Sequence, residues 1–341
     1  MSTYENICSQ LRDQPHTWLV TGAAGFIGSH LVETLLKLNQ KVVGVDNFST
    51  GKRENLFDIR QEVGLAYSQF QFIDGDITNQ ETCRRALERV DYVLHQAALG
   101  SVPRSFERPL DTNHHNVNGH LTMLNQVKLS GISRFVYASS SSVYGDHPEL
   151  PKREQNIGKQ LSPYAVSKYT NELYSQVFSN QMGVETVGLR YFNVFGKRQS
   201  PNGSYAAVIP LWLKALFTQS SVHINGDGET SRDFCYVANV VQANILAALF
   251  PMQDQKAFVF NVACGERTSL NSLFESMKNE VEKKLGTKIS MRPSYREERN
   301  GDVRHSLADI SQIMHYTGYD PTHRIFEGMK ETVNSFTLTS T

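Results

Sequence analysis

The stretch Trp18-Leu-Val-Thr-Gly-Ala-Ala-Gly-Phe-Ile-Gly28 decides the fold class of this chain. An apolar run leads into three glycines spaced three residues apart. In a strand–turn–helix unit the first permits a tight turn, the second admits a pyrophosphate, and the third lets helix and strand pack closely. The anion would sit on the helix N-terminus, although a purely structural turn can use the same residues. The expected cofactor contacts here are Gly22, Gly25, Phe26, Ile27 and Gly28.

Outward from this turn, the N-terminal half alternates β-branched runs with amphipathic stretches, which is typical of stacked βαβ units. The expected strands are Thr17–Thr21, Lys41–Asp46, Phe70–Asp74, Tyr92–His95, Arg134–Ser139 and Glu185–Tyr191. The expected helices are Phe26–Leu38, Gln80–Arg89, Asp111–Ser130 and Pro163–Gln181. The pattern predicts an α/β fold with a Rossmann-like, doubly wound parallel sheet.

The chain has 341 residues, more than one hydrophobic core usually serves, so two lobes are expected. Residues 1–16 predict a helical extension with Tyr4, Ile7, Cys8 and Leu11 on one face. Residues 17–195 form the expected dinucleotide-binding domain. Residues 196–341 form a smaller mixed α/β substrate lobe, and the two lobes are expected to exchange segments.

Composition excludes several classes of function. Lys and Arg number 34 and so do Asp and Glu, so the chain lacks the positive field that binds nucleic acid. No run approaches the roughly 20 apolar residues of a membrane span, and the first twenty residues resemble no signal peptide. The four cysteines form no CxxC pair, so no disulfide framework or metal site is expected. We therefore expect a cytoplasmic protein with a small-molecule partner.

Acidic and polar residues follow the next strands at the edge where such sheets bind ligands. Asp46 ends the second strand, where a carboxylate can accept both ribose hydroxyls and would repel a 2′-phosphate, so NAD is preferred over NADP. Lys52 and Arg53 leave NADP as an alternative cofactor, because either side chain can bind a 2′-phosphate. The further cofactor contacts expected at this edge are Asn47, Asp76, Ile77, Gln96, Ala97 and Ala98.

Tyr164 and Lys168 stand at i and i+4 behind the helix start Ser162-Pro163. A lysine ammonium and a cationic nicotinamide ring would both favour the phenolate, which suits a proton shuttle. The same spacing is also typical of a helix face that is simply exposed to solvent and has no catalytic role. The hydroxyl-rich tip Ser139–Ser142 can hold a sugar alcohol beside the tyrosine, or it can simply cap a loop.

Taken together, these motifs resemble the extended short-chain dehydrogenase/reductases from Thr21 to about Asp309. The matching segments are TGAAGFIG (21–28), DN (46–47), GDI (75–77), HQAA (95–98), the serine tip, SPYAVSK (162–168) and LRYFN (189–193). Within that family the sequence looks most like NAD-dependent UDP-sugar 4-epimerases. It is nearest the subgroup acting on UDP-N-acetylhexosamines and their uronic acids in bacterial surface-polysaccharide pathways, which the segments 98–104 and 226–234 also resemble.

The resemblance implies a reaction. Tyr164, assisted by Lys168 and Ser140, would take the proton of the sugar 4-hydroxyl while NAD takes the hydride, and the 4-keto sugar would rotate and take the hydride back. Family dehydratases read STDEVYG and decarboxylases STSEVYG, whereas this chain reads SSSSVYG at 139–145, without a carboxylate at Ser141 or Ser142. A dehydratase, decarboxylase or 4-ketoreductase and a non-catalytic NAD sensor remain the alternatives.

The resemblance also implies substrate contacts and an assembly. Ser306 stands where epimerases restricted to plain hexoses carry a bulky tyrosine, so an N-acetyl group would fit. The implied substrate contacts are Gly100, Ser101, Ser141, Ser142, Asn193, Arg232, Arg299 and Ser306, with the two arginines on the diphosphate. A homodimer through a four-helix bundle of 111–130 and 163–181 would bury Leu121, Leu124, Leu173 and Val177, unless these face their own sheet.

Overall fold

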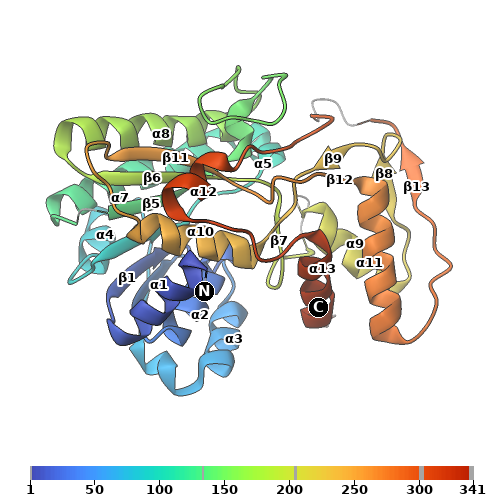
Figure 1. Ribbon diagram of the computed structural model, residues 1–341, viewed down its shortest axis with the longest axis horizontal. Helices are drawn as coiled ribbons and strands as arrows, with labels where there is room; N and C mark the ends of the chain where they lie inside the picture. Colours follow the sequence, from blue (N-terminus) through green and yellow to red (C-terminus); the bar gives the residue numbers. More distant parts are fainter. Residues whose placement is uncertain (1, 133, 203–205, 299–302, 338–341) are drawn as a thin grey trace.

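A computed structural model describes residues 2–132, 134–202, 206–298 and 303–337. Its centre is a seven-stranded parallel sheet with the strand order β11-β6-β5-β4-β1-β2-β3 (Figure 1). The strands are β1 Thr17–Thr21, β2 Lys41–Asp46, β3 Phe70–Asp74, β4 Tyr92–His95, β5 Arg134–Ser140, β6 Glu185–Tyr191 and β11 Ala257–Val262. The order reverses between β1 and β4, so the expected doubly wound, Rossmann-like sheet is confirmed.

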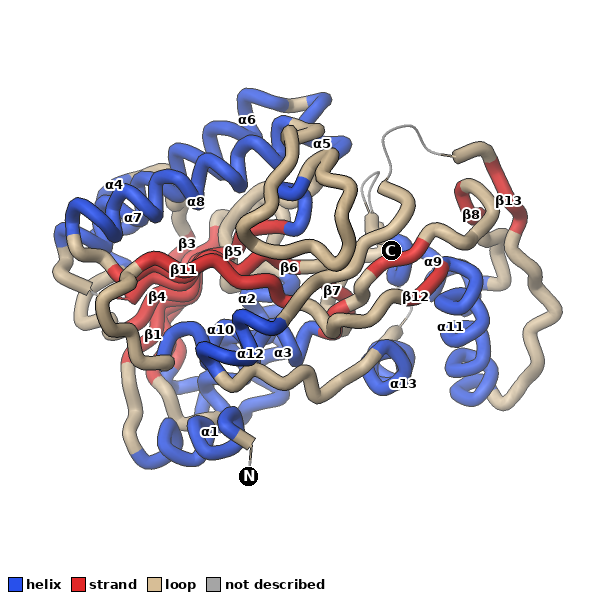
Figure 2. Tube along the Cα trace, turned by 45° about the horizontal axis from the view of Figure 1, so that its top comes forward, coloured by secondary structure: helices blue, strands red, loops and turns tan. Residues whose placement is uncertain are grey.

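Helices cover both faces of this sheet (Figure 2). One face carries α2 Phe26–Lys37, α3 Arg53–Val63 and α10 Val237–Leu249, and the other carries α4 Gln80–Ala86, α7 Gly119–Leu129 and α8 Pro163–Met182. Successive residues of β1 point to opposite sides: Trp18 and Val20 join the core under α2 and α10, and Leu19 joins the core under α4, α7 and α8. Because both faces are covered, the strands read as nearly continuous apolar runs.

Two expected helices end or break earlier than their periodicity suggests. α4 ends at Ala86 because Arg89 takes a left-handed φ of 61°, which does not continue a helix. The helix expected over 111–130 is α6 Pro109–Asn113, a π-helical turn His114–Asn118, and α7. π-helical turns often accompany functional sites, and this one lies beside the first cavity described below.

The N-terminal helix packs on the main core. α1 Thr3–Asp13 begins with a capping box in which Ser2 and Glu5 satisfy each other's backbone N–H groups. Leu11 is buried, and Tyr4, Ile7 and Cys8 pack against the core under α2 and α10.

A second lobe stands beside the sheet (Figure 1, right). Its core lies among α9 Val208–Thr218, α11 Leu270–Leu285 and α13 Ile325–Ser335. Short strand pairs complete it: β8 His223–Asn225 with β13 Ser294–Arg296, β9 Ser231–Arg232 with β12 Thr268–Ser269, and β7 Val194–Phe195 with β10 Cys235–Tyr236. α5 Val102–Glu107 packs beside α6 and α8, and α12 Ser311–Thr317 packs beside the edge strand β11. Both α10 and β11 follow residue 195 in sequence, but β11 lies in the large sheet and α10 packs on it, so the chain crosses between lobes more than once.

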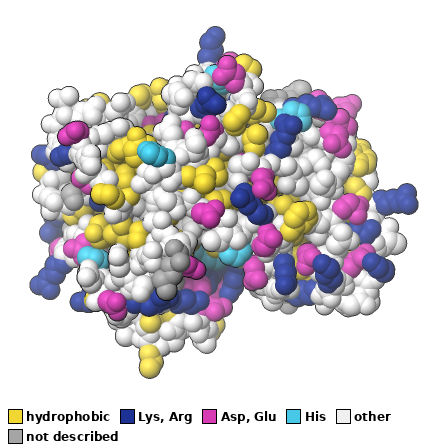
Figure 3. All heavy atoms as spheres, viewed as in Figure 1, with side chains coloured by type: hydrophobic (Ala, Val, Ile, Leu, Met, Phe, Trp, Pro, Cys, Tyr) yellow, Lys and Arg dark blue, Asp and Glu magenta, His cyan; other side chains and the backbone are white. Residues whose placement is uncertain are grey.

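Charges of both signs are mixed on the visible part of the surface (Figure 3). On the face shown in Figure 3, Lys and Arg side chains are interspersed with Asp and Glu, consistent with a net charge of zero. Within the described part of the chain, none of the helices has the length and apolar character needed to cross a membrane.

One of the residues expected at a subunit interface faces inward instead. Leu124 is fully buried in the core formed by α4, α7 and α8 of its own chain, and Leu121 packs against the same core. The expectation for Leu124 is therefore wrong, because the apolar face of α7 is used by its own sheet. Leu173 and Val177 of α8 are exposed, at 47% and 52%.

Candidate active site

A cavity opens at the carboxyl edge of β1, β2, β3, β4 and β5, where parallel sheets bind ligands. All residues expected to contact a cofactor line it: Gly22, Gly25, Phe26, Ile27, Gly28, Asp46, Asn47, Asp76, Ile77, Gln96, Ala97, Ala98, Tyr164 and Lys168. Gly100 lines it too. Local motifs on separate βα units are thus brought to one place by the parallel arrangement of their strands.

The glycine turn forms a cradle that side chains would fill. Gly22 has a φ of +69°, and a Cβ at Gly28 would lie 2.0 Å from the carbonyl oxygen of Gly22. Gly25 is the N-cap of α2 and provides no side-chain cap, so the first N–H groups of the helix face the cavity unpaired by a side chain. This fits a dinucleotide pyrophosphate.

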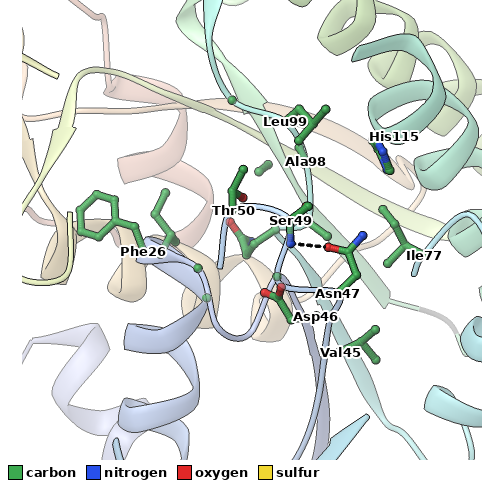
Figure 4. A pocket seen from close by; sticks show the side chains of 18 of the residues that line it. Phe26, Val45, Asp46, Asn47, Ser49, Thr50, Ile77, Ala98, Leu99 and His115 are labelled. Atoms are coloured by element: carbon green, nitrogen blue, oxygen red, sulfur yellow. Dashed lines mark hydrogen bonds between the residues drawn. The ribbon is translucent and has the colours of Figure 1, made fainter. Parts of the chain in front are cut away.

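Asp46 is oriented by the backbone around it. One carboxylate oxygen accepts a hydrogen bond from the N–H of Ala24 at 3.0 Å and the other from Phe48 at 2.8 Å. Burial raises the pKa of Asp46, and these hydrogen bonds oppose that rise. Figure 4 shows its carboxylate at the end of β2, next to the Ser49–Thr50 loop. Each oxygen keeps a second lone pair for a ribose hydroxyl.

The two basic residues that left NADP as an alternative, Lys52 and Arg53, do not line this cavity. Arg53 pairs with Asp74 at 3.1 Å and stacks over the ring of Phe48 at 4.0 Å. Asp46 lines the cavity at the end of β2 and neither Lys52 nor Arg53 does, which favours an unphosphorylated ribose.

Asn47, Asp76 and His115 form a polar chain on the other wall. The amide of Asn47 donates to Asp76 at 2.7 Å, and the His115 ring lies 3.8 Å from the same carboxylate. Burial tends to raise the pKa of Asp76, but hydrogen bonds from Thr78 and Asn47 outweigh it and hold that pKa below its usual value. His115 was missed from sequence, because it lies on the π-helical turn that periodicity does not reveal (Figure 4).

The tyrosine, lysine and serine of the expected catalytic group converge. Ser162 caps α8 by accepting from the N–H of Ala165 at 3.1 Å, which places Tyr164 and Lys168 in its first two turns. The Lys168 ammonium donates to the carbonyl of Ala138 at 2.9 Å, and burial lowers its pKa to about 8. Burial raises the pKa of Tyr164, and a hydrogen bond with Ser140 works against that rise.

Ser140 is prepared to donate its own proton. Its hydroxyl oxygen accepts from the N–H of Ser142 at 3.1 Å and from the Ser142 hydroxyl at 2.9 Å. A serine oxygen has two acceptor sites, so both are occupied and the hydroxyl hydrogen is left for Tyr164 or a ligand.

A second cavity lies in the other lobe, beyond β7. Asn193 and Arg232 line it, beside an apolar wall that includes Trp212 and Phe234. Arg232 donates to the carbonyls of Ser231 and Arg304. An aromatic and apolar wall beside a guanidinium suits a flat base attached to phosphates. Sequence reasoning missed His223, Asn225 and Arg304 in this lining, since no spacing connects them.

Other expected substrate contacts lie elsewhere. Ser101 caps α5, and Ser306 donates its N–H to the carbonyl of Ser231 at 3.0 Å. Neither these two nor Ser141 and Ser142 are among the residues that line the two cavities. Ser306 is held beside the residue that precedes Arg232. Arg299 lies outside the described residues.

Comparisons with known proteins agree with this geometry. The model of the NAD dependent epimerase/dehydratase family matches residues 18–263. A UDP-glucose 4-epimerase of Mycolicibacterium smegmatis is 33% identical over 320 residues, covering 93% of this chain and 97% of that one. The structure of a UDP-N-acetylglucosamine 4-epimerase from Methanobrevibacter ruminantium, in complex with UDP-N-acetylmuramic acid, superposes with a TM-score of 0.85 at 39% identity, covering 94% of this chain and 98% of that one. A UDP-glucose 4-epimerase of Thermus thermophilus in complex with NAD has a TM-score of 0.79 at 32% identity, covering 94% and 98%.

Proposed function

The chain belongs to the NAD-dependent epimerase/dehydratase family, and we propose that it is a 4-epimerase of UDP-N-acetylhexosamines or of their uronic acids. One observation carries the proposal: Tyr164 and Lys168 meet a serine tip that offers hydroxyls and no carboxylate. Elimination from the sugar needs an acid and a base beside carbon 6, and neither Ser141 nor Ser142 supplies one. Proton removal from an alcohol and its return need only the groups that are present.

NAD is the cofactor, and the residues present fit it. The glycine cradle suits the pyrophosphate, Asp46 suits the ribose, and the cavity runs from these groups to Tyr164 and Lys168. When bound, NAD supplies the hydride acceptor and donor for sugar carbon 4. We assign residues 17–195 to NAD binding and residues 196–341 to UDP-sugar binding. Two elements of the second range, β11 and α10, are exceptions, because β11 lies in the large sheet and α10 packs on it.

Within the site, each residue of the chain has a distinct task. Tyr164 takes the proton of the 4-hydroxyl and later returns it, and the buried Lys168 ammonium stabilises the phenolate. Ser140, with both acceptor sites occupied by Ser142, donates to the tyrosine or sugar oxygen. Asn193, Arg232 and Arg299 hold the nucleotide diphosphate while the sugar turns.

The substrate class rests on Ser306. Its segment is fastened by parallel bridges between Ser231 and His305 and between Lys152 and Ala308, which hold it beside the strand that carries Arg232 of the second cavity. A serine leaves room for an acetamido group at carbon 2. The likeness to the UDP-N-acetylglucosamine 4-epimerase of M. ruminantium supports this choice.

We also propose a homodimer. On α8, Val166, Leu173 and Val177 are exposed at 52%, 47% and 52% and recur at spacings of seven and four residues, which places them on one face. Such an apolar helix face is typical of a helical subunit interface. Compared with the sequence expectation, this set lacks Leu121 and Leu124, which pack on the core of their own chain, and adds Val166.

The function is tested with a panel of UDP-sugars. The purified protein is incubated with UDP-N-acetylglucosamine, UDP-N-acetylglucosaminuronic acid, UDP-glucose and UDP-glucuronic acid, and the products are separated. We expect interconversion of the N-acetylated pairs with no net change in NAD. Absorbance of the cofactor retained by the protein distinguishes a 4-ketoreductase, which would release its nicotinamide at each turnover. Turnover of plain UDP-hexoses alone would contradict the proposed substrate class.

A further inference from the structure

One face of α8 meets the end of β5 at three successive turns. Tyr164, Lys168 and Glu172 stand at i, i+4 and i+8 and therefore lie in a row. Tyr164 is hydrogen-bonded to Ser140, Lys168 donates to the carbonyl of Ala138, and Glu172 accepts from the hydroxyl of Ser139 at 2.5 Å. The third contact is not part of the chemistry proposed above.

Glu172 is itself held by a buried ion pair. The Arg190 guanidinium donates to both of its carboxylate oxygens, at 2.9 and 2.7 Å, and the two side chains are only 3% and 6% exposed. Arg190 also donates to the carbonyl of Glu154 at 2.8 Å and lies over the ring of Tyr144, 4.9 Å from its centre. The carboxylate is thus fixed in two directions by strand β6.

This ion pair belongs to a polar network that reaches the second lobe. The Tyr144 hydroxyl donates to Asn261 of β11 at 2.6 Å, and the amide of Asn261 donates to the carbonyl of Asp309 at 2.9 Å. Its backbone N–H donates to the carboxylate of Glu154 at 2.9 Å. Neighbours of Glu172 therefore link the tip of β5 to strands β6 and β11 and to the segment that carries Ser306.

We propose that Glu172, held by Arg190, is a positioning residue that sets the register of α8 along β5 and so aligns Tyr164 and Lys168 with Ser140. The inference rests on the proposed function. Neither Glu172 nor Arg190 lines either cavity, so both act through other residues. An ion pair buried in this way adds little stability compared with apolar packing, but it specifies one arrangement of its partners. Alignment matters because a misplacement of about 1 Å can cost about 100-fold in rate.

The test replaces the Ser139 hydroxyl and leaves the ion pair intact. Glu172→Gln is unsuitable by itself, because it leaves the buried Arg190 charge uncompensated and the chain can fail to fold. Ser139→Thr and Ser139→Val have the same shape and differ only in the hydroxyl. We expect kcat of Ser139→Val to be about 10- to 100-fold below that of Ser139→Thr, with similar KM and retained NAD.

A matched control measures general loosening of the helix. Ser179, at the far end of α8, donates its hydroxyl to the carbonyl of Val184 at 2.6 Å and is buried. Ser179→Ala should lower stability without lowering kcat. Equal kcat in the Thr and Val variants, or an equal loss of kcat in Ser179→Ala, would overturn the positioning role.

A second readout does not depend on turnover. The phenol pKa of Tyr164 is obtained from the ultraviolet titration of each variant minus that of the same variant carrying Tyr164→Phe. We expect that pKa to be higher in Ser139→Val than in Ser139→Thr, because the phenolate loses alignment with its two partners. An identical pKa contradicts the inference. If the unmodified protein turns over no UDP-sugar, the proposed function fails while this titration still decides the role of Glu172.

Discussion

The proton chemistry of the site depends on how burial acts on two neighbouring side chains of α8. Burial raises the pKa of Tyr164 and lowers that of Lys168, so each is pushed toward its neutral form. A phenolate beside an ammonium ion relieves both costs at once. The pair is therefore poised to hold a charge separation that neither residue would support by itself.

Tyr164→Phe is expected to fold and retain NAD, because the ring keeps its packing and loses only the hydroxyl. Loss of the general base should lower kcat by about 10²- to 10⁴-fold. The measurement is epimerisation of the best UDP-sugar, with retained cofactor as the control for folding. Turnover near that of the unmodified protein would show that another group accepts the proton.

Lys168 gives a pH dependence of stability with a definite sign. Its pKa is about 8 in the folded chain, below the value of about 10.4 expected when unfolded. Between these values the unfolded chain holds a proton that the folded chain has released, so raising the pH favours folding. Relative to Lys168→Met, the unmodified protein should gain stability from about pH 8 to 10 in urea unfolding. A constant difference across this range would contradict the depressed pKa.

Asp46→Ala is expected to reduce NAD retention far more than stability. The carboxylate loses the proposed ribose contact, together with two backbone hydrogen bonds. Asp74→Ala is the matched control, because Asp74 is the register partner of Asp46 on β3 but does not line the cavity. Cofactor content after purification is measured for both. Equal content in the two variants would remove Asp46 from the cofactor site.

At the scale of elements, the segment around Ser306 links the substrate lobe to the serine tip. Its backbone is bonded to Ser231 on one side, and Asp309 is bonded to Lys152 and Asn261 on the other. A change of side chain at this position therefore alters the available space rather than the path of the chain.

Ser306→Tyr should selectively suppress N-acetylated substrates. Overpacking costs about 1–3 kcal/mol, which corresponds to a change of about 5- to 150-fold in specificity. The measurement is kcat/KM for UDP-N-acetylglucosamine and UDP-glucose in both proteins. Equal losses on the two substrates would show that position 306 does not control substrate size.

At the scale of the whole molecule, α8 serves two surfaces. Its inner face carries Tyr164, Lys168 and Glu172, and its outer face exposes Leu173 and Val177. A dimer through the outer face would brace the helix that holds the catalytic residues.

Light scattering at micromolar concentration should give twice the chain mass of 38.4 kDa. Leu173→Asp combined with Val177→Asp should shift the protein toward the monomer, since charges would be buried at the interface. Leu65→Asp, at a site that is 94% exposed on another surface, is the control. A single-chain mass for the unmodified protein would refute the dimer.

The sequence by itself determined the βα order, the glycine turn, the cofactor edge and the Tyr164–Lys168 pair, because each depends on local spacing and on the common direction of parallel strands. Only the tertiary structure decided that β11 completes the sheet, that a π-helical turn brings His115 to the cavity, and that Leu124 faces inward. It also placed Glu172 between Ser139 and Arg190, residues 33 and 18 positions away. Contacts of this kind leave no periodic trace, because a buried polar side chain is specified by partners that only the packed fold brings near.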